Sequence, residues 1–534
     1  MNQEKRALLA AGLSFLVFLL WYQFYAKPRI PVGVPPVVSQ AAAPTSSAPI
    51  APVAANLPAV PVGPEQLTVI SNDFFEAAFS SHGGRIKDFK LKKFKETVTP
   101  ESPLVNLLGR SDERMADLGC QDCNFPFNNA LNYSLVAHTQ DEVTFEGETG
   151  GVVIRKSYRW APDKYLLTMN ISLHNQTGQM LQGKMTLLSQ QRQQTTAGRK
   201  GLLSFLQPAT NVRDFVYQTG GKVQRFGQKD GSENVLGGTA WGGIEDQYFF
   251  TALITRRLAS DQSLQLSRVG DLLSLNFVTP VVTIPPQGGH QEEFSLYLGP
   301  KDRLYLAQAG VGLEQAVDYG WFGLLAVPIL KLLQFFHSVV KNWGVAIILL
   351  TVFAKILLNP LTIKSMQQMK EMQRIQPEMQ KLKEKYGNDK QRLNVEVMAL
   401  FKLHKVNPMG GCLPMVLQMP IYIALYKVLY NSIEIYHAPF VGFYRDLSAP
   451  DPFFILPLLL GVAMVLQQKL TPQTSVDPVQ KQMMMIMPIM FTGFMLFLPL
   501  GLVLYIFINT TMSVVQQYMS QRDLRWRDLL HISS

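Results

Sequence analysis

The chain has 534 residues, a formal net charge of +10 and a hydrophobic fraction of 47%. This length exceeds that of a single ordinary domain. Long apolar runs flank a long polar segment, and the excess positive charge lies beside the apolar runs. That placement argues against a nucleic-acid-binding protein and indicates an integral membrane protein.

The first apolar run, residues 7–25, reads ALLAAGLSFLVFLLWYQFY and follows Lys5 and Arg6. It is long enough to span a bilayer, and no small-residue cleavage site follows it. We therefore expect residues 1–27 to form an uncleaved signal-anchor with its N-terminus in the cytoplasm. Residues 28–64 contain ten prolines, which predicts an extended linker.

The polar segment 65–303 alternates apolar and polar residues between turn signals such as His82-Gly83-Gly84. Short strands at this spacing predict an all-β sandwich, placed in the periplasm. Such sandwiches often bind sugars, so a sugar enzyme is an alternative. The histidines of this segment form no recognisable proton-transfer constellation; they are His82, His138, His174 and His290. We therefore expect no catalytic site there.

Two of the three cysteines form a C-x-x-C motif, Cys120 and Cys123. A metal site would need further ligands at similar spacing, and a redox motif would need a thioredoxin-like setting. The sequence therefore favours a small local disulfide in a loop and predicts no metal and no other cofactor. The third, Cys412, is expected to be a small apolar packing residue.

Residues 304–341 carry one polar stripe on an otherwise apolar helix, formed by Lys331, Gln334, Ser338 and Lys341. This pattern predicts a periplasmic helix lying in the membrane interface. The alternative is a further span. That span would move residues 364–405, with ten Lys/Arg and five Asp/Glu, to the outside. The preference of Lys and Arg for the cytoplasm argues against it.

The predicted fold is a polytopic α-helical membrane protein with a large periplasmic all-β sandwich domain and a cytoplasmic helical hairpin. Both termini are cytoplasmic, and the tail is residues 521–534. The hairpin is residues 364–411, with helices on either side of a Gly-Asn-Asp turn. The six spans include five in a core at 342–520; they lie near 7–25, 342–363, 413–431, 453–469, 485–498 and 500–518.

One lysine stands inside an apolar core span, Lys355 in TVFAKILLNPLT. A charge at the centre of a span costs about 2.5–3.5 kcal/mol on insertion scales. The core spans contain no Asp or Glu that could pair with it. Polar residues inside the spans need internal partners or water, and we expect four of them to converge with Lys355 on a water-filled groove: Thr351, Gln418, Tyr505 and Asn509. The alternative is a purely structural lysine.

Several stretches between residues 315 and 520 resemble YidC-type membrane protein insertases, in the Gram-negative bacterial branch of the YidC/Oxa/Alb family. They are VDYGWF, NWG, NPMGGCLPMVLQMPIYIALY, DLSAPDPFFILPLLLG, DPVQKQMMMIMPIMF and LPLGLVLYIFINT. The resemblance implies an inner-membrane insertase and chaperone, not an enzyme, with a hydrophilic groove open to cytoplasm and lipid. Bacterial members usually have arginine where Lys355 stands.

The resemblance also implies partners. These are nascent membrane proteins, the ribosome and signal-recognition receptor at the cytoplasmic loops, the SecYEG channel with its accessory subunits, and the lipid bilayer. A transporter or lipid scramblase could also use a charged groove, but it would more often show inverted repeats, and the sequence has none that we detect.

Overall fold

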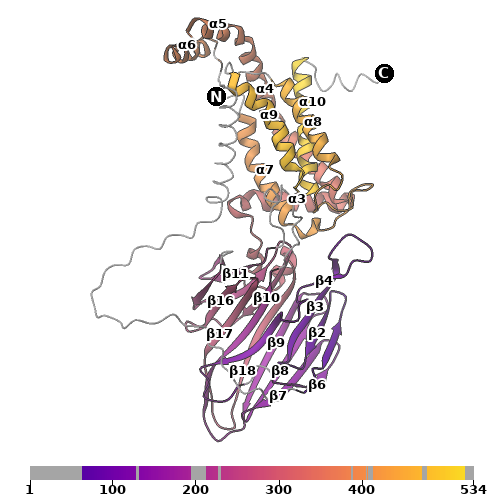
Figure 1. The fold of residues 1–534 in the computed structure, drawn as a ribbon, viewed down its shortest axis with the longest axis vertical. Coiled ribbons are helices and arrows are strands. Elements are labelled where there is room, and N and C mark those ends of the chain that lie inside the picture. Colours follow the sequence, from indigo (N-terminus) through magenta and orange to yellow (C-terminus); the bar gives the residue numbers. More distant parts are fainter. Residues whose placement is uncertain are drawn as a thin grey trace, which may run out of the picture.

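The computed structural model describes residues 63–127, 131–193, 212–226, 230–386, 389–404, 406, 413–471 and 478–522. The predicted anchor, nearly all of the linker, Cys412 and the chain after residue 522 lie outside the described residues. The described chain forms a β domain, defined here as strands β1 to β18, followed by helices (Figure 1).

The β domain consists of two nine-stranded antiparallel sheets. The first sheet contains β1 (Leu67–Ser71), β2 (Phe75–Ser80), β3 (Arg85–Lys95), β4 (Leu104–Asn106), β5 (Arg114–Gln121), β10 (Leu181–Arg192), β13 (Gly231–Leu236), β16 (Ser263–Val269) and β17 (Leu272–Ile284). The second contains β6 (Ser134–His138), β7 (Glu142–Thr149), β8 (Val152–Trp160), β9 (Leu166–Asn175), β11 (Asp214–Thr219), β12 (Lys222–Phe226), β14 (Thr239–Glu245), β15 (Phe249–Thr255) and β18 (Gly289–Pro300).

Alternating burial along the strands places one face of each sheet in a shared core. In β8 every second residue is buried, from Val152 to Trp160, as the period of two of a strand requires. Phe79 of β2 contacts Tyr158 of β8 across the two sheets, with ring centroids 4.9 Å apart. The β-sandwich predicted from the sequence is therefore confirmed.

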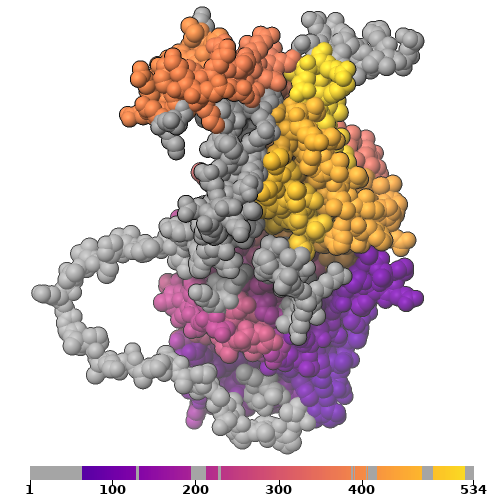
Figure 2. All heavy atoms as spheres, turned by 45° about the horizontal axis from the view of Figure 1, so that its top comes forward, coloured from indigo at the N-terminus to yellow at the C-terminus, as the bar shows by residue number. Residues whose placement is uncertain are grey.

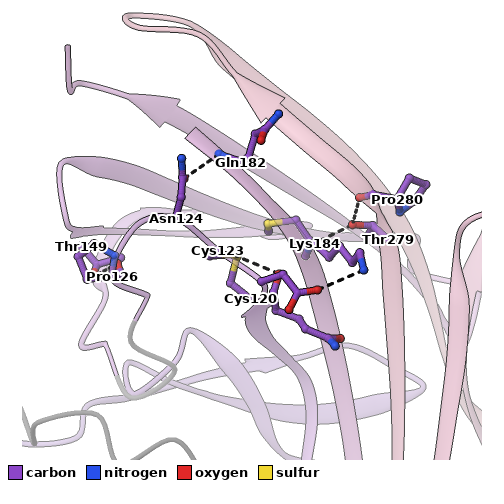
Figure 3. The surroundings of a disulfide bond; sticks show 12 residues. Cys120, Cys123, Asn124, Pro126, Thr149, Gln182, Lys184, Thr279 and Pro280 are labelled. Carbon is purple, nitrogen blue, oxygen red and sulfur yellow. Dashed lines mark hydrogen bonds and ion pairs between the residues drawn. A yellow bond between two sulfur atoms is a disulfide. The ribbon is translucent and has the colours of Figure 1, made fainter. Parts of the chain in front are cut away.

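Cys120 and Cys123 are joined by a disulfide at the end of β5 (Figure 3). This is the local disulfide that the sequence favoured, although Cys120 lies in the strand itself. The bridge packs over Gly183 of β10, where an added Cβ would lie 2.1 Å from the Cys123 sulfur. Asn124 then ties the chain to β10, because its backbone N–H donates to the Gln182 carbonyl at 3.0 Å.

Helices follow the β domain. They are α2 (Arg303–Gln308), η2 (Leu313–Ala316), η3 (Gly320–Phe322), α3 (Gly323–Val340), α4 (Trp343–Arg374), α5 (Gln376–Tyr386), α6 (Lys390–Leu403), α7 (Leu413–Asn431), η5 (Ile433–Ile435), α8 (Ile455–Leu470), α9 (Pro478–Met495) and α10 (Leu500–Gln521). Figure 1 shows α4 and α7 to α10 as a bundle, with α3 at the end next to the β domain.

Three of the described helices are long and apolar enough to cross a membrane: Gly320–Val340, Trp343–Arg374 and Leu500–Gln521. Two shorter apolar helices, Ile455–Leu470 and Met485–Met495, accompany them. The first of these ranges contains α3, which the sequence places in the interface. Length and composition alone therefore do not distinguish the two predictions for α3.

The hairpin differs from the sequence prediction in its first helix. That helix was expected to run unbroken to Tyr386, but α4 continues to Arg374 and the break falls at Ile375. Pro377 explains the break, because proline lacks an N–H and crowds the preceding turn. A small core of its own joins α5 and α6; its buried members are Met372, Ile375, Met379, Leu400 and Val406. The pair projects from the bundle (Figure 2).

The segment after α7 docks on the β domain. Tyr436 packs against Phe94, Tyr248 and Phe249, with ring centroids 4.8 to 6.3 Å apart. Its hydroxyl donates to the Lys95 carbonyl at 2.9 Å. The Gln247 side chain also donates to the carbonyl of residue 430, at 2.8 Å. We call this contact the interdomain joint. It fixes the end of α7 against the β domain.

Candidate functional site

The first turn of α4 fixes the position of this helix in the bundle. Asn342 is the N-cap, and its side-chain oxygen accepts from the Val345 backbone N–H at 3.0 Å, satisfying a donor that the helix leaves free. The same side chain donates to the Phe440 carbonyl at 2.8 Å. Gly344 allows the Phe440 ring to approach, since an added Cβ would lie 2.0 Å from it.

Lys355 lies 13 residues after this cap, about 20 Å along the helix. Its relative exposure is 9%. The ammonium donates to the Ser513 hydroxyl of α10 at 2.7 Å, and that hydroxyl donates to the Asn509 carbonyl at 2.8 Å. Among the described residues no ion pair to Lys355 is formed at 4.0 Å or less. Its hydrogen-bond partner is thus a neutral hydroxyl.

A second group of hydrogen bonds joins α7 to α10 nearby. The Gln418 side-chain nitrogen donates to the Tyr505 hydroxyl at 3.1 Å. The Asn509 side chain donates to the Tyr422 hydroxyl, and the Tyr422 and Tyr505 rings meet edge to face at 5.6 Å. Three helices therefore bring together four of the five predicted residues: Lys355, Gln418, Tyr505 and Asn509.

Thr351 is the fifth predicted residue, and its hydroxyl has a local partner. It is completely buried, and its hydroxyl donates to the carbonyl of Ile347, four residues earlier in α4. Such back-bonding satisfies a hydroxyl within its own helix. Thr351 therefore lies on the same helical face as Lys355, but no hydrogen bond in the described structure connects it to the other site residues.

The sequence prediction missed two residues of this polar network, Ser513 and Tyr422, and the neighbouring polar pair Asn359 and Gln516. Ser513 follows Asn509 by four residues, and Tyr422 follows Gln418 by four. Asn359 follows Lys355 by four, and its side-chain oxygen accepts from Gln516 of α10 at 3.2 Å. Gln516 follows Ser513 by three. Residues three or four apart share a helix face, so these spacings were the signal that could have found all four.

The described residues contain no group of three or more His, Cys, Asp or Glu side chains able to hold a metal ion. The network therefore offers hydrogen-bond donors and acceptors and one cation, all within an apolar bundle. Such a set can donate to carbonyl or carboxylate groups and accept from N–H groups.

Comparisons with known proteins cover both halves of the chain. Residues 67–332 match the family described as YidC periplasmic domain, and residues 335–527 match 60Kd inner membrane protein. A membrane protein insertase YidC from Geotalea daltonii is 36% identical over 544 residues, covering 98% of this chain and 99% of the relative. One from Syntrophus aciditrophicus is 36% identical over 553 residues, covering 96% of this chain and 99% of the relative.

Among solved structures, an active YidC insertase crystal structure covers 86% of this chain and 95% of its own, with 18% identity and a TM-score of 0.36. The full-length relatives are insertases, so the alternative of a sugar enzyme in the β domain is wrong. Identity above 30% along almost the whole chain decides the assignment. The chain belongs to the YidC family of inner-membrane protein insertases.

Proposed function

We propose that the polar network of α4, α7 and α10 lines a hydrophilic groove that receives polar segments of nascent membrane proteins. One observation carries this proposal: Lys355 is buried in an apolar bundle, and among the described residues no carboxylate forms an ion pair with it. A protonated ammonium has three donors, and Ser513 accepts one of them. Carboxylates or carbonyls of a substrate would accept the others.

The thermodynamic driving force is burial of the substrate's apolar side chains in lipid. The groove lowers the cost of moving the accompanying polar segment, because it supplies donors and acceptors at membrane depth. Lys355 lies about 20 Å from the start of α4, roughly two thirds of the way across a hydrocarbon core of about 30 Å. Lys355 would therefore lie nearer the cytoplasmic surface than the periplasmic one, and a groove open to the cytoplasm and lipid would reach it from the cytoplasmic side.

The interdomain joint supports one topology. The joint holds the α7–α8 segment against the β domain, so both lie on one side of the membrane, which we assign to the periplasm. Both ends of α3 also lie there, since the Asn431 side chain donates to the Asp318 carbonyl at 3.2 Å and Lys341 leads directly into α4. This geometry favours α3 in the interface over α3 as a span.

The α5–α6 hairpin lies at the opposite end of the bundle (Figure 1), which supports a cytoplasmic position. There it would receive the nascent chain, the ribosome or the signal-recognition receptor. We further propose six spans with both termini in the cytoplasm, and action either alone or beside SecYEG and its accessory subunits. The Lys/Arg-rich composition of residues 364–405 agrees with this orientation.

Charge substitutions at Lys355 test the groove. We expect Lys355→Arg to retain insertion, because charge and reach are kept. Lys355→Glu should slow the insertion of substrates with acidic tails most, because attraction becomes repulsion. Lys355→Ala should be intermediate, and mildest for short uncharged tails. Insertion is measured in cells depleted of the native protein, using one substrate with either an acidic or an uncharged tail.

A photocrosslinker at Ser513 adds a direct measurement, with Leu357 as the matched control because that side chain is 67% exposed on α4. We expect the nascent chain to crosslink to position 513 through its polar segment. Full activity of Lys355→Glu on the acidic tail, together with no crosslink from position 513, would reduce Lys355 to a structural residue.

A further inference from the structure

A second pair of polar side chains joins α4 to α10, farther from the β domain than Lys355. Gln516 donates from its side-chain nitrogen to Asn359 at 3.2 Å. Its relative exposure is 8%. The other polar atom of that amide, Oε1, is buried and has no hydrogen-bond partner in the described part of the chain. A buried acceptor without a partner is costly unless water or a ligand supplies a donor.

The spacing places this pair beside the lysine. Asn359 follows Lys355 by four residues, so it lies on the same face of α4, about 6 Å farther along. Gln516 follows Ser513 by three residues on α10. The two helices are thus joined by two successive polar pairs, Lys355 with Ser513 and Asn359 with Gln516. The first pair carries a charge, and the second is neutral.

We propose that Asn359 and Gln516 form a separate binding site for the backbone N–H groups of the entering polypeptide, on the cytoplasmic side of Lys355. This site rests on the proposed function. A segment crossing in an extended form lacks the internal hydrogen bonds of a helix, so its N–H groups need acceptors where water is scarce. Gln516 Oε1 supplies one. Because an amide is uncharged, this site accepts acidic and neutral segments alike, whereas Lys355 distinguishes them.

Gln516→Leu tests this difference. We expect it to slow insertion roughly threefold to tenfold, the value of about one neutral hydrogen bond, and equally for the acidic and uncharged versions of one substrate. Gln517→Leu is the matched control, because Gln517 is half-buried and accepts from the Thr471 hydroxyl at the end of α8, at 3.4 Å. The Gln517→Leu variant should insert the acidic and the uncharged substrate at the normal rate. A defect confined to the acidic tail would contradict the proposal.

The double variant Asn359→Leu with Gln516→Leu separates binding from a purely structural hydrogen bond. Replacing both partners of a structural pair by apolar side chains is often nearly neutral, so a structural pair predicts restored insertion. A binding site predicts that the double variant stays slow. A photocrosslinker at position 359 should also trap shorter nascent chains, from an earlier stage of synthesis, than a photocrosslinker at position 513. A photocrosslinker at position 357 should trap no nascent chain of either length.

Restored insertion in the double variant would overturn the proposal. So would the absence of a crosslink from position 359 when position 513 does crosslink. If neither position crosslinks and the Lys355 variants show no dependence on tail charge, the groove itself is wrong, and this site with it.

Discussion

Lys156 makes the stability of the β domain depend on pH. It is completely buried in β8, where its ammonium donates to the Gly83 carbonyl and lies 4.9 Å from the centre of the Tyr133 ring. Burial lowers the pKa of Lys156 from 10.5 to about 7, while Asp117 raises the pKa and Arg85 lowers it further. The unfolded chain keeps the ordinary lysine pKa.

The number of protons bound in each state decides whether the free energy of unfolding rises or falls with pH. Between pH 7 and 10.5 the unfolded state holds a proton on Lys156 that the folded state has largely lost, so the free energy of unfolding rises with pH. The slope approaches about 1.4 kcal/mol per pH unit inside that window and vanishes below it. From pH 7 to pH 9 the β domain should therefore gain roughly 2 kcal/mol.

Lys156→Met should remove this slope, because methionine has no proton to lose. The measurement is hydrogen exchange of the β8 amides in the whole protein in detergent micelles, at several urea concentrations and at pH 7, 8 and 9. Lys222→Met serves as the control, since Lys222 is an exposed lysine of the same domain. Equal slopes in the native protein and in Lys156→Met would show that the buried lysine does not couple to pH.

Three further predictions concern the arrangement of the parts. Single cysteines at Lys402 and Val441, in a background without native cysteines, should react differently with an impermeant reagent on spheroplasts: position 441 should react and position 402 should not, and the reverse would refute the topology. Deleting residues 370–400 should impair insertion while the bundle still assembles, because the hairpin has a core of its own; normal insertion would show that the hairpin is dispensable. Tyr436→Ala should weaken the interdomain joint by roughly 2 kcal/mol, seen as a broader distribution of spin-label distances between the β domain and the bundle, and an unchanged distribution would contradict a role for this joint.

Periodic patterns account for most of the fold that the sequence predicted. Alternation identified the sandwich, and apolar runs located the helices α4, α7, α8, α9 and α10 within a few residues at several of their ends. The largest error at a helix end lay beyond Lys355, where α4 continues past the predicted span end at residue 363 to Arg374. Pro360 lies inside α4 without ending it, and the helix keeps the same 3.6-residue period beyond residue 363, so the apolar run and the helix end at different residues.

Four residues of the candidate polar network were named from the sequence, because a charge or an amide in an apolar run is conspicuous, whereas its hydrogen-bond partner is not. Lys355 and Asn509 stand out by composition alone. The hydroxyl that accepts from the lysine is set by the rotation of α4 and α10 about their axes relative to each other. The sequence pattern of one helix gives no information about that relative rotation. The interdomain joint was missed for a related reason, because Phe94, Tyr248 and Tyr436 are far apart in the chain and share no period.

The cap at Asn342 holds one end of α4, so the helix can tilt about that end. The first turn of α4 is held against the α7–α8 segment by the hydrogen bond from Asn342 to the Phe440 carbonyl, while the other end of α4 leads into the hairpin beyond Arg374. A tilt of about 5° about the pinned end would displace Lys355, about 20 Å away, by roughly 2 Å, and the Asn359 pair by somewhat more. A bond of 2.7 Å to Ser513 does not survive such a displacement. A force applied to the hairpin would therefore separate the lysine from this hydroxyl without any direct contact at Lys355 or Ser513.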